Sequence, residues 1–204
     1  MMFSARSFGC LAALMMGVLM VAPYAHAQQR NPQQLMGRTV LDEPASSYRF
    51  ERFVINSPDQ QRRWRVNVAI PAKASKTPSP VLYALDGNAV AMVLDQPLLA
   101  ELAASKAPPV LVLIGYDNEL RIDSPARTRD YTAWIDRADD EGGTTQAVGG
   151  GADLFLDLIE RRLQPEVERR ANIDTHQPSL WGHSPGGLFV PNAPSTRPAA
   201  FQRS

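Results

Sequence analysis

SLWGHSPGGLFV, residues 179–190, places a serine between glycines in the order G-x-S-x-G, at Gly182, Ser184 and Gly186. This pattern is typical of a sharp turn from a strand into a helix, where glycines allow close backbone packing and the serine hydroxyl is exposed at the top of a sheet. Apolar residues precede the motif, so we expect a short strand over residues 178–184 that brings Ser184 to its carboxyl end. Ser184 is therefore the candidate nucleophile of an α/β fold.

Two segments upstream have the alternation of a half-buried antiparallel pair. Residues 48–56 and 62–71 each alternate large apolar with polar side chains. The turn signal Ser57-Pro58-Asp59 separates them. We expect two strands joined as a hairpin at the start of the domain.

Two short apolar runs, residues 80–87 and 108–116, have the composition of strands buried on both faces. Residues 89–106 between them have a helical pattern, which Pro97 is expected to kink or divide. A strand–helix–strand order of this kind predicts a parallel pair with a right-handed crossover.

The regular pattern ends at Asp117 and returns at residue 152. Residues 117–151 read as a long charged loop, either a lid or substrate loop or a flexible surface excursion. Its acidic residues fit no cation-binding loop spacing, which favours a solvated loop: Asp136, Asp139, Asp140 and Glu141. Residues 152–170 then predict an amphipathic helix, with apolar residues four apart and a kink expected at Pro165.

The first 27 residues have the features of a secretory signal peptide. Arg6 precedes an apolar run over residues 10–22, and Ala25-His26-Ala27 has the small-x-small form of a cleavage site. We expect the mature chain, residues 28–204, to be exported to the periplasm or secreted, with no stable membrane anchor. An uncleaved leader that tethers the chain is the alternative.

Composition excludes several classes of function. The only cysteine, Cys10, lies in the leader, so disulfides, thiol catalysis and cysteine-based zinc sites are excluded from the mature chain. Lys plus Arg and Asp plus Glu both number 21, so the chain has no basic surplus for nucleic acid or anionic membranes. We expect no metal and no cofactor.

Five segments carry a family resemblance, in this order: VLYALDGNAV (81–90), PPVLVLIGY (108–116), ARTRDYTAW (126–134), FLDLIE (155–160) and WGHSPGGLFV (181–190). Together they resemble the exported esterases that hydrolyse ferric enterobactin-type siderophores, members of the α/β-hydrolase superfamily, from about Tyr48 to Ser204. The resemblance implies that residues 28–204 form a partial α/β-hydrolase domain, with a mostly parallel sheet and helices on both faces. It also implies a Ser-His-acid triad with Ser184 as nucleophile, and a small-molecule ester substrate such as a siderophore.

The loop after the third strand of this fold supplies an oxyanion N–H, and here it is Asp86-Gly87-Asn88. We expect a donor at Gly87 or Asn88, unless the glycine merely ends the strand.

Arg127, Arg129 and Tyr131 are candidate substrate-loop residues. Arginine pairs with catecholate or carboxylate oxygens, and tyrosine can stack on an aromatic substrate. The alternative is an ion pair between Arg127 and Asp130 that pins the loop.

The sequence departs from the family where the triad should be completed. The family places its catalytic acid and histidine in a stretch after the nucleophile, and the 204 residues do not contain that stretch. His26 lies in the leader, which leaves two histidines in residues 28–204. We expect His176 in an exposed loop, and His183 packed with its side chain directed away from Ser184. Neither is expected to act as the base.

Proline gives a second departure. Pro185 follows the serine where a backbone N–H should serve the oxyanion, and proline has none. Pro191, Pro194 and Pro198 interrupt the helix that should follow. We expect a shortened or decayed esterase, or a fragment of a longer gene, that is inactive alone and self-associates through an exposed sheet edge. A non-catalytic exported protein that binds a small ligand, or a gene remnant, is the alternative.

Overall fold

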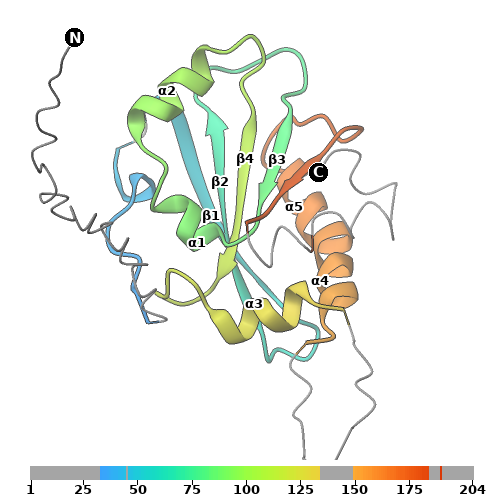
Figure 1. The fold of residues 1–204 in the computed structure, drawn as a ribbon. Helices are drawn as coiled ribbons and strands as arrows, with labels where there is room; N and C mark the ends of the chain where they lie inside the picture. Colours follow the sequence, from blue (N-terminus) through green and yellow to red (C-terminus); the bar gives the residue numbers. More distant parts are fainter. Residues whose placement is uncertain (1–32, 45, 134–148, 184–188, 190–204) are drawn as a thin grey trace, which may run out of the picture. The chain divides into compact units, whose positions relative to one another are not determined.

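The computed structural model describes residues 33–44, 46–133, 149–183 and 189. The chain divides into two units, Met1–Arg30 and Asn31–Ser204, and every described residue belongs to the second. Its centre is a five-stranded sheet in the order β1-β2-β4-β3-β5 (Figure 1). The strands are β1 (Tyr48–Asn56), β2 (Arg63–Pro71), β3 (Val81–Ala84), β4 (Val110–Tyr116) and β5 (Ser179–Trp181).

The pairing of the strands confirms the predicted hairpin. β1 and β2 run antiparallel, with Tyr48 opposite Pro71 and Asn56 opposite Arg63. β2 is also antiparallel to β4, whereas β3 is parallel to both β4 and β5. The described sheet is therefore mixed, with parallel pairing confined to the three strands whose carboxyl ends lead to the candidate site.

A buried central strand separates two cores, one on each face of the sheet. Every residue of β4 is buried, as its unbroken apolar sequence predicts. Because successive side chains point to opposite faces, Val112 and Ile114 join one apolar cluster while Leu111 and Leu113 join the other. Helical residues contribute to both clusters, which confirms helices on both faces.

The predicted helix after β3 is divided in two. Helix α1 (Gly87–Ala91) ends before α2 (Gln96–Ala104) begins. Asp95 caps α2 by accepting a hydrogen bond from the Leu98 N–H at 2.8 Å, and Pro97 lies in the first turn, where its missing N–H costs nothing. Pro97 thus helps to begin the second helix.

The predicted amphipathic helix after residue 151 is present as three consecutive pieces: α4 (Ala152–Leu158), a π-helical turn η2 (Ile159–Leu163) and α5 (Gln164–Glu168). The side chains spaced four apart in the sequence are all buried: Phe155, Ile159, Leu163 and Val167. The helix widens immediately before Pro165, which cannot continue an α-helical hydrogen-bond ladder.

The prediction of one loop over residues 117–151 was wrong in part, because it contains helix α3 (Ser124–Tyr131). Asp123 caps this helix by accepting from the Ala126 N–H at 3.0 Å, and Pro125 occupies its first turn. The acidic residues from Asp136 to Glu141 lie outside the described residues. None of the helices in the described part of the chain is long and apolar enough to cross a membrane.

Candidate active site

The loop that leaves β3 turns sharply into α1 against the backbone of β4. Asp86 adopts the left-handed conformation, with φ 53° and ψ 43°. A Cβ atom on Gly87 would lie 2.6 Å from the backbone nitrogen of Ile114, so only glycine allows this approach. The first N–H groups of a helix have no intrahelical acceptor. The backbone N–H groups of Gly87 and Asn88 therefore remain the candidate oxyanion donors.

The side chain of Asn88 has a structural role in this arrangement. It is buried, and its Nδ2 lies 3.1, 3.2 and 2.9 Å from the carbonyl oxygens of Tyr116, Asn118 and Leu120. Asn88 therefore fixes the turn that follows β4. Its Oδ1 faces Gly115, where a Cβ atom would lie 2.2 Å away, so the fit of α1 on β4 requires a second glycine.

The carboxylate of Asp86 forms a bidentate ion pair with Arg127 of α3. Arg127 Nε donates to Oδ1 at 2.9 Å and Nη2 donates to Oδ2 at 2.5 Å. The Tyr131 hydroxyl also donates to Oδ1, at 3.3 Å. Burial raises the pKa of Asp86, and the charge and hydrogen bonds of Arg127 partly oppose this rise. The Asp86 carboxylate therefore accepts hydrogen bonds from two residues of α3 and does not cap the N-terminus of α1.

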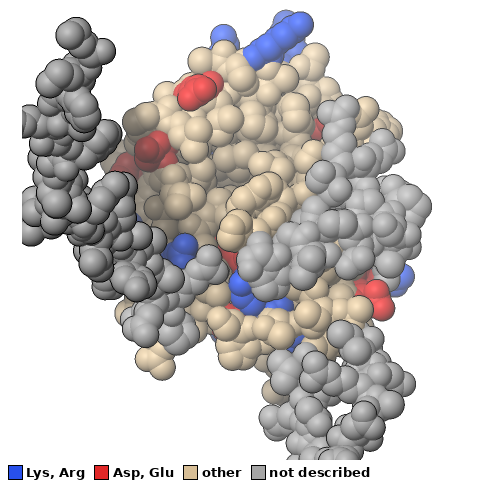
Figure 2. All heavy atoms as spheres, viewed as in Figure 1, with Lys and Arg blue, Asp and Glu red and all other residues tan. Residues whose placement is uncertain are grey.

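Arg127 also contacts the segment that carries the serine motif. Its Nη2 donates to the carbonyl oxygen of His183 at 3.1 Å, and the Leu85 N–H donates to the Trp181 carbonyl at 2.9 Å. The candidate oxyanion loop thus lies beside the residue that precedes Ser184. Ser184 and Pro185 themselves lie outside the described residues, and their roles remain predictions. Atoms of Lys or Arg side chains reach the surface between α1 and α3 (Figure 2).

The candidate substrate-loop residues occupy different environments. Tyr131 is only 4% exposed, and its ring packs against Phe155 and Phe189 with centroids 5.7 Å apart in both pairs. Arg127 lies over the same ring at 5.6 Å. Tyr131 is thus part of the core, whereas the Arg129 side chain is 43% exposed.

The alternative in which Arg127 pairs with Asp130 was wrong, because Arg127 pairs with Asp86. Asp130 is fully buried and accepts hydrogen bonds at Oδ2 from Trp64 Nε1 at 3.0 Å and from the Tyr116 hydroxyl at 3.2 Å. Its Oδ1 lies 3.2 Å from Arg129 Nε and 3.7 Å from Arg62 Nη1. Burial raises the pKa of Asp130, although the hydrogen bond from Trp64 and the charges of Arg129 and Arg62 oppose the rise. Sequence reasoning missed this network because its members lie far apart in the chain.

The two histidines differ in how well they match expectation. His176 is exposed, as predicted, and its N–H donates to Asp174 Oδ1 at 2.9 Å. His183 is also exposed, so its predicted packing role was wrong. The strand before it ends at Trp181, three residues short of the predicted end, which leaves His183 outside the sheet.

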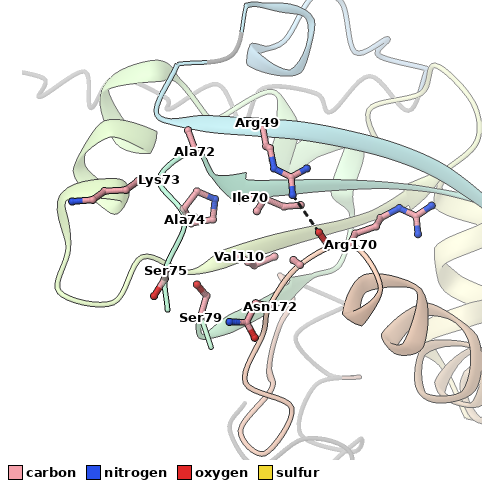
Figure 3. Close-up of a pocket in the computed structure, with 12 residues that line it drawn as sticks. Arg49, Ile70, Ala72, Lys73, Ala74, Ser75, Ser79, Val110, Arg170 and Asn172 are labelled. Carbon is pink, nitrogen blue, oxygen red and sulfur yellow. Dashed lines mark hydrogen bonds between the residues drawn. The ribbon is translucent and has the colours of Figure 1, made fainter. Parts of the chain in front are cut away.

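A pocket of about 190 Å³ lies at the opposite end of the sheet, where β4 begins (Figure 3). Arg49 donates there to the Arg170 carbonyl oxygen at 3.2 Å. Both arginines also form ion pairs with Glu51, and Arg170 pairs with Glu166 as well, so each already has a carboxylate partner within the protein. This pocket lies at the other end of the sheet from the loop that leaves β3, so it does not belong to the candidate active site.

Known proteins share both sequence and fold with this chain. The apo-salmochelin esterase of Escherichia coli O6:H1 is 40% identical over 158 residues, which are 76% of this chain and 49% of that protein. The ferri-bacillibactin esterase BesA of Bacillus subtilis is 32% identical over 157 residues, 73% of this chain and 54% of that protein. The chain therefore spans about half the length of these curated relatives.

Solved structures of proteins with similar sequences have a similar fold. The enterobactin hydrolase IroE in complex with DFP matches with a TM-score of 0.69 and 38% identity, over 79% of this chain and 64% of that one. The BES protein from Bacillus cereus matches with a TM-score of 0.65 and 27% identity, over 78% and 62%. Residues 57–204 match the family described as "Putative esterase". The chain has an α/β-hydrolase fold and belongs to this esterase family.

Proposed function

We propose that the chain carries the nucleophile and the oxyanion segment of a serine ester hydrolase. The observation that supports this most directly is the contact of Arg127 with both Asp86 and the His183 carbonyl. It joins the loop that offers the Gly87 and Asn88 N–H groups to the residue before Ser184. Membership of the esterase family supports the same function.

The proposed reaction is acyl transfer to Ser184. The serine oxygen attacks the ester carbonyl carbon and loses its proton to a general base, while the N–H groups of the oxyanion loop stabilise the charge on the carbonyl oxygen. The alcohol leaves with a proton, and water then releases the acid from the acyl-enzyme. No described residue is assigned as the base.

The proposed substrates are esters of the siderophore type or related carboxylic esters. The names of similar proteins support this class, since they are esterases of salmochelin and bacillibactin and a hydrolase of enterobactin. We also propose that residues 1–27 form a cleaved leader and that the domain acts after export.

We also propose that these 204 residues alone are inactive in the sense that any residual turnover is far slower than that of a complete esterase. Pro185 provides no N–H at the position after the serine, and loss of one oxyanion donor typically reduces kcat by about 10²- to 10³-fold. The same proline supports a second candidate function, an exported protein that binds a small ligand without hydrolysing it.

Comparison of the chain with Ser184→Ala tests the proposal. We expect only residual hydrolysis of a neutral aryl ester and substoichiometric labelling of Ser184 by a fluorophosphonate. Both should be abolished in Ser184→Ala and retained in Ser75→Ala, which changes an exposed serine beside the pocket at the other end of the sheet. Equal ester hydrolysis by the chain and Ser184→Ala, with no labelling, would contradict the proposal. Binding of a tris-catecholate trilactone under those conditions would select the second function.

A further inference from the structure

Arg127 occupies the point where three segments of the candidate site meet. We propose that Arg127 is a positioning residue, which holds the oxyanion loop against the His183 carbonyl at the end of the described part of the β5 segment, and that it is not a ligand of an anionic substrate. The proposal rests on the proposed function and assigns a task to a residue for which the sequence suggested substrate binding.

The charge of Arg127 is already matched within the protein. Its side chain is 11% exposed, and that of Asp86 is 8% exposed. An anionic substrate at this guanidinium would lie close to the Asp86 carboxylate and would be repelled by it. Breaking a buried ion pair leaves an uncompensated charge, which is strongly unfavourable. A substrate therefore gains little by competing for Arg127.

The geometry uses the planar fork of the guanidinium. Nε and Nη2 bind the two carboxylate oxygens of Asp86, and Nη2 also reaches the His183 carbonyl oxygen. Lysine has one nitrogen and cannot reproduce this set of bonds. Arg127 of α3 therefore stabilises the left-handed backbone of Asp86, and this backbone sets the direction of the Gly87 and Asn88 N–H groups.

Arg127 and its two partners, Asp86 and the His183 carbonyl, form a unit that we call the clamp, and Tyr131 connects this clamp to the apolar core. The Asp86 N–H donates to the Tyr131 hydroxyl oxygen at 3.2 Å, and the hydroxyl donates to Asp86 Oδ1. Since the ring of Tyr131 packs against both Phe155 and Phe189, which also pack against each other, these contacts cannot shift without disturbing the core. Arg127 thus connects a rigid support to the two segments that must cooperate in acyl transfer.

This arrangement predicts how the rates should respond. A misplacement of about 1 Å of reacting groups can cost about 10²-fold in rate. The loss caused by removing a positioning residue should be the same for neutral and anionic esters, because neither charge contacts Arg127. Removal of a substrate ligand would instead weaken binding of the anionic ester alone.

The test compares Arg127→Ala and Arg127→Lys with Arg161→Ala, whose exposed side chain pairs only with Asp157 at 3.8 Å among the described ion pairs. Hydrolysis of a neutral aryl ester and its carboxylate analogue is measured below the unfolding temperature of every variant. We expect kcat to fall about 10²-fold for both esters in Arg127→Ala with little change in KM, poor rescue by lysine, and no effect in Arg161→Ala. A rise in KM confined to the anionic ester would overturn the proposal, as would unchanged rates.

Hydrogen–deuterium exchange gives a measurement that does not depend on activity. In Arg127→Ala we expect faster exchange in peptides covering residues 83–90 and 179–183. The exchange rate in the β1–β2 hairpin should not change. Asp86→Ala should give the same result, and the double variant should add nothing further. Unchanged or uniformly faster exchange would refute the clamp. If Ser184→Ala equals the wild type in hydrolysis, the proposed function fails, whereas the exchange result still decides whether the clamp exists.

Discussion

Asp86 and Asp130 show how two buried carboxylates near one site receive different partners. Asp86 is held by an arginine fork and supports the backbone of the candidate oxyanion loop. Asp130 accepts from Trp64 and Tyr116 and ties α3 to the centre of the sheet. In both, burial raises the carboxyl pKa more than the donors lower it. Each carboxylate is therefore a site where stability depends on pH.

The pH dependence of Asp130 can be separated from the rest of the protein with Asp130→Asn. A pKa raised in the folded state means that the folded protein binds more protons than the unfolded chain between about 3.9 and the raised value. The stabilisation of the wild type relative to Asp130→Asn should therefore decrease as pH rises through this window. Urea unfolding at a series of pH values measures this difference in the free energy of unfolding.

Asp42 provides the control of opposite sign. The hydrogen bond from the Thr39 N–H, at 2.9 Å, lowers the pKa of Asp42. Its contribution should be present above about 3.9 and lost as pH falls through the lowered value. The difference between the wild type and Asp42→Asn should therefore increase with pH. The same slope for Asp130 and Asp42 would contradict the assigned shifts.

At the scale of elements, the helical segment α4–η2–α5 closes one face of the sheet through a cluster of aromatic rings. Phe155 of α4 is 1% exposed and lies 5.9 Å from Trp64 and 5.7 Å from Tyr131, measured between ring centroids. Trp64 also donates a hydrogen bond to Asp130, and Tyr131 donates one to Asp86. Packing of α4 therefore supports the polar network beneath the candidate site.

Phe155→Ala should lower the free energy of unfolding by about 3–5 kcal/mol, because it removes a large buried side chain and leaves a cavity. Leu154→Ala is the matched control, since Leu154 is its neighbour in the same helix but is 60% exposed. This control should change stability by less than about 0.5 kcal/mol. Chemical denaturation measures both values, and similar losses in the two variants would show that α4 is not packed as described.

The elements differ in how far the sequence predicted them. The hairpin was predicted almost residue for residue, because alternating side chains and a turn signal are local. Helix α3 was missed because its sequence, SPARTRDY, contains few apolar residues, although Asp123 and Pro125 are start signals that could have indicated it. The partner of Arg127 could not be predicted, since Asp86 lies 41 positions away and only the fold brings them together.

At the scale of the whole domain, the described sheet has two outer strands with different protection. β1 pairs only with β2 among the described strands, and its sequence contains the charged residues Arg49, Glu51 and Arg52. β5 pairs only with β3 in that set, and its sequence, SLW, contains no charge. Charged side chains on an outer strand oppose pairing with another sheet, whereas an apolar outer strand favours it. The described strands thus indicate β5 as the edge for self-association.

Trp181→Lys tests this expectation, because Trp181 lies on β5 with 47% of its surface exposed. The wild type should form dimers or larger species whose proportion rises with concentration, and a charge on β5 should shift it toward the monomer. Val93→Lys places the same charge at a more exposed apolar residue, 69% exposed, between α1 and α2. Size-exclusion chromatography with light scattering measures the mass of each protein. A wild type that is monomeric at every concentration would exclude association through β5, and an equal shift in Val93→Lys would show that added charge acts without regard to the sheet edge.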